Sequence, residues 1–131
     1  NFVYQALAGE PITVFGNGTQ SRCFGHVYDA VEAILRLIAA PAAVGQVVNV
    51  GNDEEVTIMQ LAERVREATG SNSEIRLVPY NEAYPEGFED MHRRVPDVRK
   101  LERMVGFRPT IPLAQIIADV VADQRARLAA R

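Results

Sequence analysis

The sequence predicts an α/β fold, a small mixed domain made of short strands and about five helices. Short runs rich in β-branched and aromatic residues alternate along the chain with longer segments whose apolar residues recur every three or four positions. Glycines, prolines and capping pairs separate these segments. With 131 residues, of which 47% are hydrophobic and 24% charged, the chain has the size and composition of one globular domain, residues 1–131.

The helices are predicted from stripes of apolar residues and from their end signals. Thr57 with Gln60, and Asp29 with Glu32, have the spacing of a capping box. Asp97 stands where it would cap a further helix, and glycine follows the first, third and fourth helices as a stop signal. The expected helices are residues 1–8, 29–38, 58–69, 98–105 and 113–128.

Three β-rich runs predict the strands. The first run leads into Gly16-Asn17-Gly18, which favours a tight turn because these residues tolerate positive φ. Residues 19–27 should then run extended, whereas residues 79–91 are interpreted as an irregular, polar connection. The three expected strands are residues 12–15, 47–51 and 75–78.

Composition argues against several classes of function. The net charge of −3 gives no global footprint for nucleic acid. No apolar run reaches the ~18 residues that a membrane span needs. Cys23 is the only cysteine, so no internal disulfide can form, which fits a cytoplasmic protein. With only two histidines beside it, a metal site is not expected.

The loop after the first strand is the first candidate site. Phe15 offers a face against which a base could lie, and Arg22 offers a planar fork of donors that matches phosphate oxygens. Gln20 adds an amide between them. The alternative is a solvated turn with a surface arginine, because a hairpin alone explains the glycines and Asn17.

The second candidate site is the pair Arg93 and Arg94, just ahead of Asp97. In an extended segment these two side chains point to opposite faces, so at most one of them can readily face a given ligand. Asp97 is interpreted as a helix cap rather than a catalytic acid. The alternative is a salt-bridged surface, in which the arginines are neutralised by the nearby acids Glu86, Glu89 and Asp90.

The usual residues of nicotinamide chemistry do not occur in this sequence. There is no G-x-G-x-x-G or G-x-x-G-x-x-G pattern, so nothing would hold a dinucleotide pyrophosphate in the usual way. No tyrosine is followed four positions later by a lysine, and Lys100 is the only lysine. We therefore expect neither catalytic nor cofactor-binding residues in this chain.

Four motifs in series resemble the extended short-chain dehydrogenases/reductases, a group that contains UDP-glucose 4-epimerases, UDP-glucuronate decarboxylases and dTDP-glucose 4,6-dehydratases. The resemblance covers nearly the whole chain and keeps that family's order. The motifs are residues 11–24 (PITVFGNGTQSRCF), 27–32 (VYDAVE), 49–51 (NVG) and 94–109, which contains RVPD, Lys100 and GFRP.

The resemblance implies a substrate site for a UDP- or dTDP-sugar. The first strand would line the nucleotide base, with Phe15 packed against it. Gln20 would help to hold the nucleotide, and one arginine from each candidate site would grip the diphosphate from two sides. The implied substrate-binding residues are Thr13, Val14, Phe15, Gln20, Arg22 and Arg94.

The resemblance also implies that this chain is the C-terminal, nucleotide-sugar-binding part of an enzyme, without its N-terminal Rossmann core. In the family, NAD and the catalytic Tyr-x-x-x-Lys pair belong to that core. The helix at 29–38 and the strand at 47–50 would pack with it, so an exposed apolar surface or a homo-oligomer is expected. His26 and Tyr28 depart from the residues that are usual in the family, which leaves the sub-family open.

The leading hypothesis is the substrate-binding part of an NAD-dependent epimerase or dehydratase, similar to UDP-glucose 4-epimerase and inactive on its own. UDP-glucuronate decarboxylase and dTDP-glucose 4,6-dehydratase are the alternatives within the family. A stand-alone, non-catalytic nucleotide-sugar-binding module and a purely structural domain are the alternatives outside it. The sequence leaves the sugar and the reaction open, because the sugar-contacting residues of the family lie mostly in the core.

Overall fold

The computed structural model describes residues 1–83, 85 and 90–130 of the chain. These residues form two compact units. The first unit comprises residues 1–22, 56–93 and 117–131, and the second comprises residues 23–55 and 94–116. The chain passes from one unit to the other within strand β2 (Ser21–Cys23), strand β3 (Glu55–Thr57) and helix α6 (Leu113–Ala129), and once more after Arg93. Strands β2 and β3 are paired.

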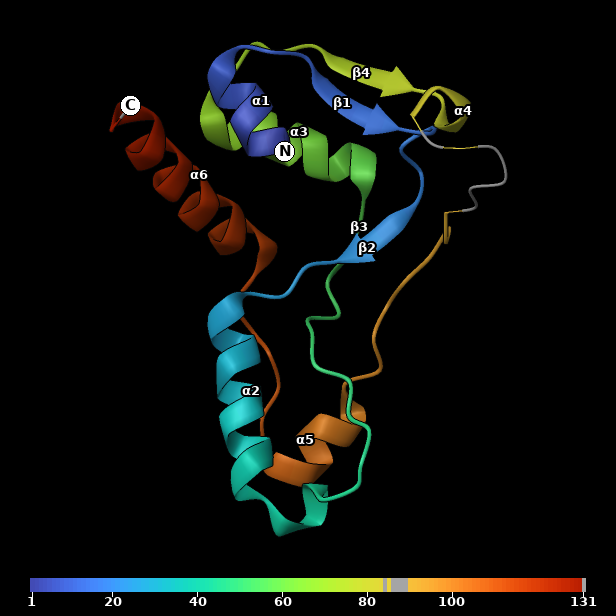
Figure 1. The fold of residues 1–131 in the computed structure, drawn as a ribbon, viewed down its shortest axis with the longest axis vertical. Helices are drawn as coiled ribbons and strands as arrows, with labels where there is room; N and C mark the ends of the chain where they lie inside the picture. Colours follow the sequence, from blue (N-terminus) through green and yellow to red (C-terminus); the bar gives the residue numbers. More distant parts are fainter. Residues whose placement is uncertain (84, 86–89, 131) are drawn as a thin grey trace. The chain divides into compact units, whose positions relative to one another are not determined.

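A parallel pair of strands, β1 (Ile12–Phe15) and β4 (Ile75–Val78), organises the first unit. Helices α1 (Phe2–Ala8) and α3 (Ile58–Thr69) lie side by side against this pair (Figure 1). Parallel strands need a crossover connection, and α3 is the helix that leads the chain back to β4. The core is formed by buried apolar residues of these elements, namely Val3, Ala6, Ile12, Val14, Ala62 and Val65.

The ends of the first unit's helices follow the sequence signals. Helix α3 begins with a complete capping box, in which Thr57 accepts from the Gln60 N–H and Gln60 accepts from the Thr57 N–H. Helices α1 and α3 end at Gly9 and Gly70, whose φ angles of 72° and 68° need a residue without a side chain. The expected helices and strands of this unit are confirmed, and a further short helix, α4 (Tyr80–Ala83), lies in the connection predicted to be irregular.

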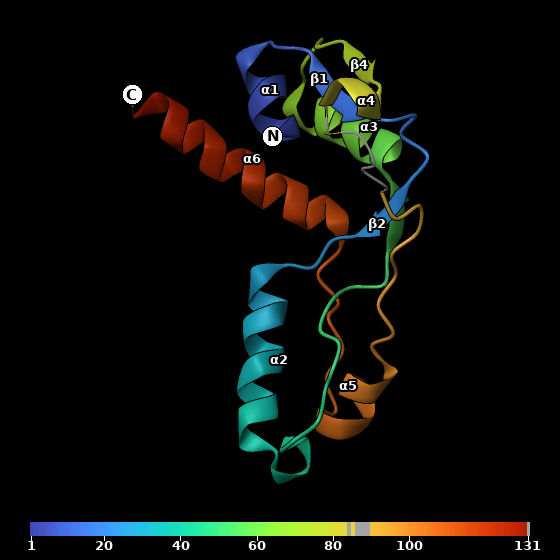
Figure 2. The ribbon, with the colours of Figure 1, turned by 45° about the vertical axis from the view of Figure 1, so that its right-hand side comes forward.

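Helices α2 (Val27–Ala39) and α5 (Arg99–Val105) pack together in the second unit, with the 3-10 turn η1 (Pro41–Ala43) after α2 (Figures 1 and 2). Asp29 on α2 is buried, and its Oδ2 atom accepts the backbone N–H groups of Thr110 and Ile111 at 3.0 and 2.9 Å. This carboxylate therefore ties the segment after α5 to α2. No helix among the described residues is both long and apolar enough to cross a bilayer.

Two helix starts differ from those expected. Helix α2 begins at Val27, and His26 is its cap, because the His26 Nδ1 atom accepts the Tyr28 N–H at 3.1 Å. The expected cap, Asp29, is instead used for the tertiary contact. Helix α5 has Val98 as its N-cap, although the Asp97 carboxylate accepts the Arg99 N–H at 3.0 Å.

Residues 47–51 form no strand, contrary to expectation. A strand needs a hydrogen-bonded neighbour, and no strand among the described residues pairs with this segment. The Val47 carbonyl accepts a hydrogen bond from Lys100 Nζ at 2.8 Å instead, and the Val47 side chain is 86% exposed.

An exposed apolar surface is present on α2, as expected. Large apolar side chains recur every three or four positions along the exposed side of α2, so they lie on one face of the helix. Ile38 on this face is 78% exposed. The exposed apolar residues of α2 and of the following segment are Val27, Tyr28, Val31, Ile34, Leu35, Ile38, Val44 and Val47, and we call them the α2 apolar face.

Candidate functional site

Strand β1 sorts the expected base-lining residues onto two faces. Successive side chains of a strand point to opposite sides. Ile12 and Val14 are fully buried in the core, whereas Thr13 and Phe15 are half-buried on the other side. The Val14 side chain therefore supports the strand and does not line the pocket that Thr13 and Phe15 face.

A pocket of about 210 Å³ lies over this outer face of β1, within the first unit. Sites that bury a drug-sized ligand are typically about 300–1,000 Å³, so this pocket has room for part of a nucleotide sugar. Its lining combines apolar surface, uncharged polar groups and one pair of opposite charges. The lining residues are Phe2, Thr13, Phe15, Gln20, Arg22, Ile58, Tyr80 and Asp90.

The loop from Gly16 to Gln20 is closed by hydrogen bonds at both ends. The Gln20 side chain is buried and donates from Nε2 to the Phe15 carbonyl at 2.8 Å. The Gln20 and Gly18 carbonyls accept the N–H groups of Ile58 and Met59, both at 3.0 Å. The first N–H groups of α3 are therefore used by the loop and by the capping box, so this helix start does not offer them to an anion in the pocket.

Arg22 enters the pocket from β2 with its guanidinium held on two sides. Its Nη1 atom donates to the Ser21 and Met91 carbonyls, each at 2.7 Å. Its Nη2 atom forms an ion pair with Asp90 Oδ1. Asp90 Oδ2 in turn accepts from the Tyr80 hydroxyl at 2.8 Å. The Arg22 side chain is 21% exposed, which makes this a partly desolvated cation at the pocket.

The Tyr80 ring packs against Gly16, in the space that a side chain at this position would fill. A Cβ atom on Gly16 would overlap the ring, lying 2.7 Å from Cζ and 3.0 Å from the hydroxyl oxygen, and the φ of Gly16 is +72°. Both the close approach and the left-handed backbone require glycine here. The tight turn predicted from Gly16-Asn17-Gly18 thus also seats an aromatic ring.

The expected site residues fall into two groups. Thr13, Phe15, Gln20 and Arg22 line one pocket of the first unit, whereas Arg94 is an exposed residue of the second unit. Asp90, considered as a counter-ion of the arginines at 93 and 94, is paired with Arg22. The other two acids considered there, Glu86 and Glu89, lie outside the described residues.

Several residues of the pocket are not identified by the sequence patterns. Thr13 is held by Gln5, whose Nε2 donates to Thr13 Oγ1 at 2.9 Å. Phe2, Tyr80 and Asp90 complete the lining. Phe2 and Gln5 are three positions apart on α1 and so share a face, which is a usable signal. Tyr80 and Asp90 come from the connection after β4, where no periodicity marks them.

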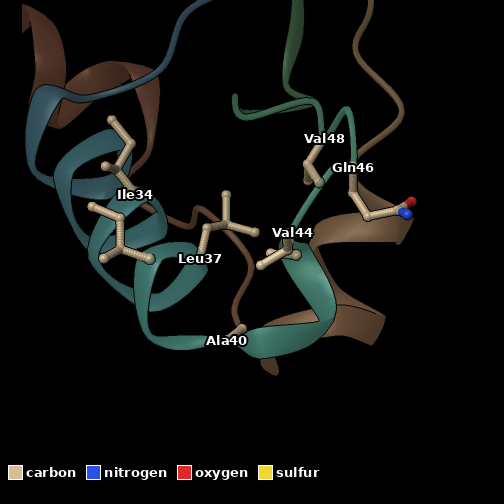
Figure 3. A pocket seen from close by; sticks show the side chains of 8 residues that line it. Ile34, Leu37, Ala40, Val44, Gln46 and Val48 are labelled. Carbon is tan, nitrogen blue, oxygen red and sulfur yellow. The ribbon is translucent and has the colours of Figure 1, made fainter.

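A second pocket, of about 360 Å³, lies in the second unit between α2 and the segment that follows it (Figure 3). Its only polar lining side chain, Gln46, accepts from Lys100 Nζ at 3.0 Å. This pocket offers no charge to a phosphate and continues the α2 apolar face. Its lining residues are Ile34, Leu37, Ile38, Ala40, Ala43, Val44, Gln46 and Val48.

Comparison with known proteins places the chain in one family. The GDP-mannose 4,6 dehydratase family model matches residues 1–120. The UDP-N-acetyl-alpha-D-glucosaminuronate decarboxylase of Bacillus cytotoxicus is 37% identical over 92% of this chain and 37% of its own length. The UDP-glucuronic acid decarboxylase 4 of Arabidopsis thaliana is 39% identical over 98% of this chain and 27% of its own length.

The fold agrees with these relatives. The UDP-glucose 4-epimerase of Thermotoga maritima, solved with UDP-glucose, superposes with a TM-score of 0.84 and 26% identity, over 97% of this chain and 38% of that one. The chain thus spans between about a quarter and two fifths of the proteins it matches. The resemblance read from the four motifs is confirmed at the level of the family. Because the family model covers most of its residues, this protein is a member of the family described as GDP-mannose 4,6 dehydratase.

Proposed function

We propose that this chain is the nucleotide-sugar-binding part of a longer NAD-dependent enzyme that acts on a UDP- or dTDP-sugar. The observation that carries the proposal is the first-unit pocket, where Arg22 stands beside Phe15, Thr13 and Gln20. A guanidinium beside an aromatic face and two small polar groups suits a nucleotide with a phosphate. The relatives named for UDP-sugar substrates support the same assignment.

Within this proposal, Phe15 and Thr13 contact the base, and Gln20 holds the loop that carries them. Val14 contributes to this site only through its backbone in β1, because its side chain is buried in the core. Arg22 holds the diphosphate in the first-unit pocket. The role that the four motifs imply for Arg94, as a second ligand of the diphosphate, stays a prediction. Two arginines suit a diphosphate because each phosphate group carries its own negative charge.

Two reactions are candidates for the whole enzyme. Decarboxylation of a UDP-sugar acid is supported by relatives 37% and 39% identical in sequence, whose names state that activity. Epimerisation of UDP-glucose is supported by the solved structure with a TM-score of 0.84. We favour decarboxylation, because the sequence identity is higher. Assays of the longer protein with UDP-glucuronate, UDP-glucose and dTDP-glucose discriminate these reactions.

The residues of this chain do not fit the dinucleotide. Among the described residues, the glycines with positive φ lie in the turn after β1, at helix ends and at Gly45, and none of these lies in a turn from a strand into a helix N-terminus. We assign NAD and the hydride chemistry to another part of the protein, and this chain holds the substrate in place for that part.

We assign the α2 apolar face to contact with that NAD-binding part or, failing it, with a second copy of the chain. The family relationship and the share of each relative's length that the chain spans support the first partner. We place the whole protein in the cytoplasm, in keeping with the single cysteine of this chain, Cys23.

Calorimetric titration of UDP into the longer protein tests the site. Arg22→Ala should weaken binding by roughly 10- to 100-fold, because it removes a charged hydrogen-bond donor from a partly desolvated site, and Arg94→Ala should weaken binding as well if Arg94 is the second phosphate ligand. Arg66→Ala, which removes an exposed arginine of α3, is the matched control and should change the affinity less than about twofold. Unchanged affinity in both site variants would contradict the proposal.

A further inference from the structure

Three side chains form a continuous chain of hydrogen bonds along the pocket of the first unit. The Tyr80 hydroxyl donates to Asp90 Oδ2 at 2.8 Å, and Asp90 Oδ1 pairs with Arg22 Nη2. All three residues line the pocket. The Asp90 carboxylate thus uses one oxygen for the phenol and the other for the guanidinium.

The contacts of Arg22 leave a defined edge of its guanidinium. Both hydrogens of Nη1 are directed to backbone carbonyls, of Ser21 and Met91. One hydrogen of Nη2 is directed to Asp90. Among the described residues, Nε has no hydrogen-bond partner and Nη2 has only Asp90, so the Nε–Nη2 edge is the one offered to a phosphate, and the orientation of the guanidinium plane decides where this edge points.

Tyr80 is suited to fix that orientation because it cannot shift toward Gly16. Its ring lies where a Cβ of Gly16 would be, so it is in direct contact with the turn after β1. The hydroxyl is consequently held at a set distance from the strand that carries Phe15. This hydroxyl holds the Asp90 carboxylate in place, and the carboxylate in turn holds the Arg22 guanidinium.

We propose that Tyr80 is a positioning residue of Arg22 and acts through Asp90. The Tyr80 hydroxyl holds the carboxylate, and the carboxylate holds the guanidinium with its free edge toward the phosphate. This proposal rests on the proposed role of Arg22 as a phosphate ligand. It adds a residue outside the motifs of the sequence and a mechanism by which the segment after β4 sets phosphate affinity.

The test compares Tyr80→Phe with unaltered longer protein, because this change keeps the ring against Gly16 and removes only the hydroxyl. UDP affinity should fall by about 3- to 10-fold, less than on removal of Arg22, because the guanidinium remains but is no longer held in one orientation. Uridine affinity should change by less than about twofold, since uridine has no phosphate for Arg22 to bind. In an Arg22→Ala background, Tyr80→Phe should no longer affect UDP, as a double-mutant cycle requires of a residue acting through another.

A readout without ligand makes the proposal independent of the substrate. In the side-chain ¹⁵N spectrum, the Arg22 Nη signals should be resolved in the unaltered protein and averaged by faster rotation in Tyr80→Phe. Tyr4→Phe, which removes an exposed hydroxyl on α1, is the matched control and should leave both readouts unchanged.

The outcomes separate the two ideas. Unchanged Arg22 signals in Tyr80→Phe, or an equal loss of uridine and UDP affinity, would overturn the positioning role. Unchanged UDP affinity in Arg22→Ala and Arg94→Ala would overturn the proposed function instead. In that case, averaged Arg22 signals in Tyr80→Phe would still support the link from Tyr80 to Arg22.

Discussion

At the scale of single residues, the pocket depends on close approaches that particular side chains permit. Gly16 leaves room for the Tyr80 ring, and Gly18 lies against Val14 and Met59, where an added Cβ would come within 3.1 Å of the Met59 Cβ. The two glycines of the turn thus serve packing as well as backbone conformation. A substitution at either position should therefore affect the site and not only the local turn.

Gly16→Ala should destabilise the protein by about 2–4 kcal/mol, since it combines left-handed backbone strain with overlap against a ring. Gly9→Ala is the control, because Gly9 has the same φ of 72° but no atom within 4 Å of an added Cβ. It should cost about 1 kcal/mol. Urea unfolding measures both, and equal losses would show that Tyr80 does not press on Gly16.

The residue scale also shows how far sequence reasoning reaches into the site. Phe15, Gln20 and Arg22 were predictable because they lie in one short loop with a recognisable order. Asp90 was not, because it meets Arg22 across 68 positions of sequence and no local pattern encodes that pairing. Its closeness in sequence to Arg93 and Arg94 suggested these arginines as its partners, whereas Asp90 pairs with Arg22.

At the scale of elements, the start of α3 links helix stability to the site. Its first N–H groups are shared between the Thr57–Gln60 capping box and the carbonyls of Gly18 and Gln20. The capping box was predictable because both of its bonds are local. The start of α2 was not, because Asp29 is taken by Thr110 and Ile111, more than 80 positions away.

Thr57→Ala should lower the free energy of unfolding by about 1 kcal/mol, the usual cost of losing an N-cap. Thr69→Ala, at the other end of the same helix, is the control. The Thr69 hydroxyl bonds back to the Val65 carbonyl at 2.8 Å, a contact that does not stabilise helices, so this change should be close to neutral. Thermal unfolding compares the two variants, and equal losses of stability would contradict a stabilising role of the capping box.

At the scale of the molecule, α2 is inverted relative to an ordinary surface helix. A surface helix buries its apolar stripe and exposes its charges. Here Asp29 is buried, while Ile34, Leu35 and Ile38 are 51%, 58% and 78% exposed. The strand expected at 47–51 is likewise unpaired. The apolar pattern of both segments is therefore unmatched by any neighbour in the part of the chain that the structure describes, which agrees with the partner proposed for this face.

The 131-residue chain by itself should therefore associate through the α2 apolar face, since large exposed apolar patches mark interaction surfaces. Sedimentation velocity should show concentration-dependent species that Ile38→Glu reduces, because a charge in that patch must be desolvated on association. Val120→Glu, on the 42%-exposed Val120 of α6, is the control and should not reduce them. In the longer protein, where we propose that the NAD-binding part covers this face, Ile38→Glu should instead lower the stability. A monomeric chain at all concentrations would contradict the assignment of this face.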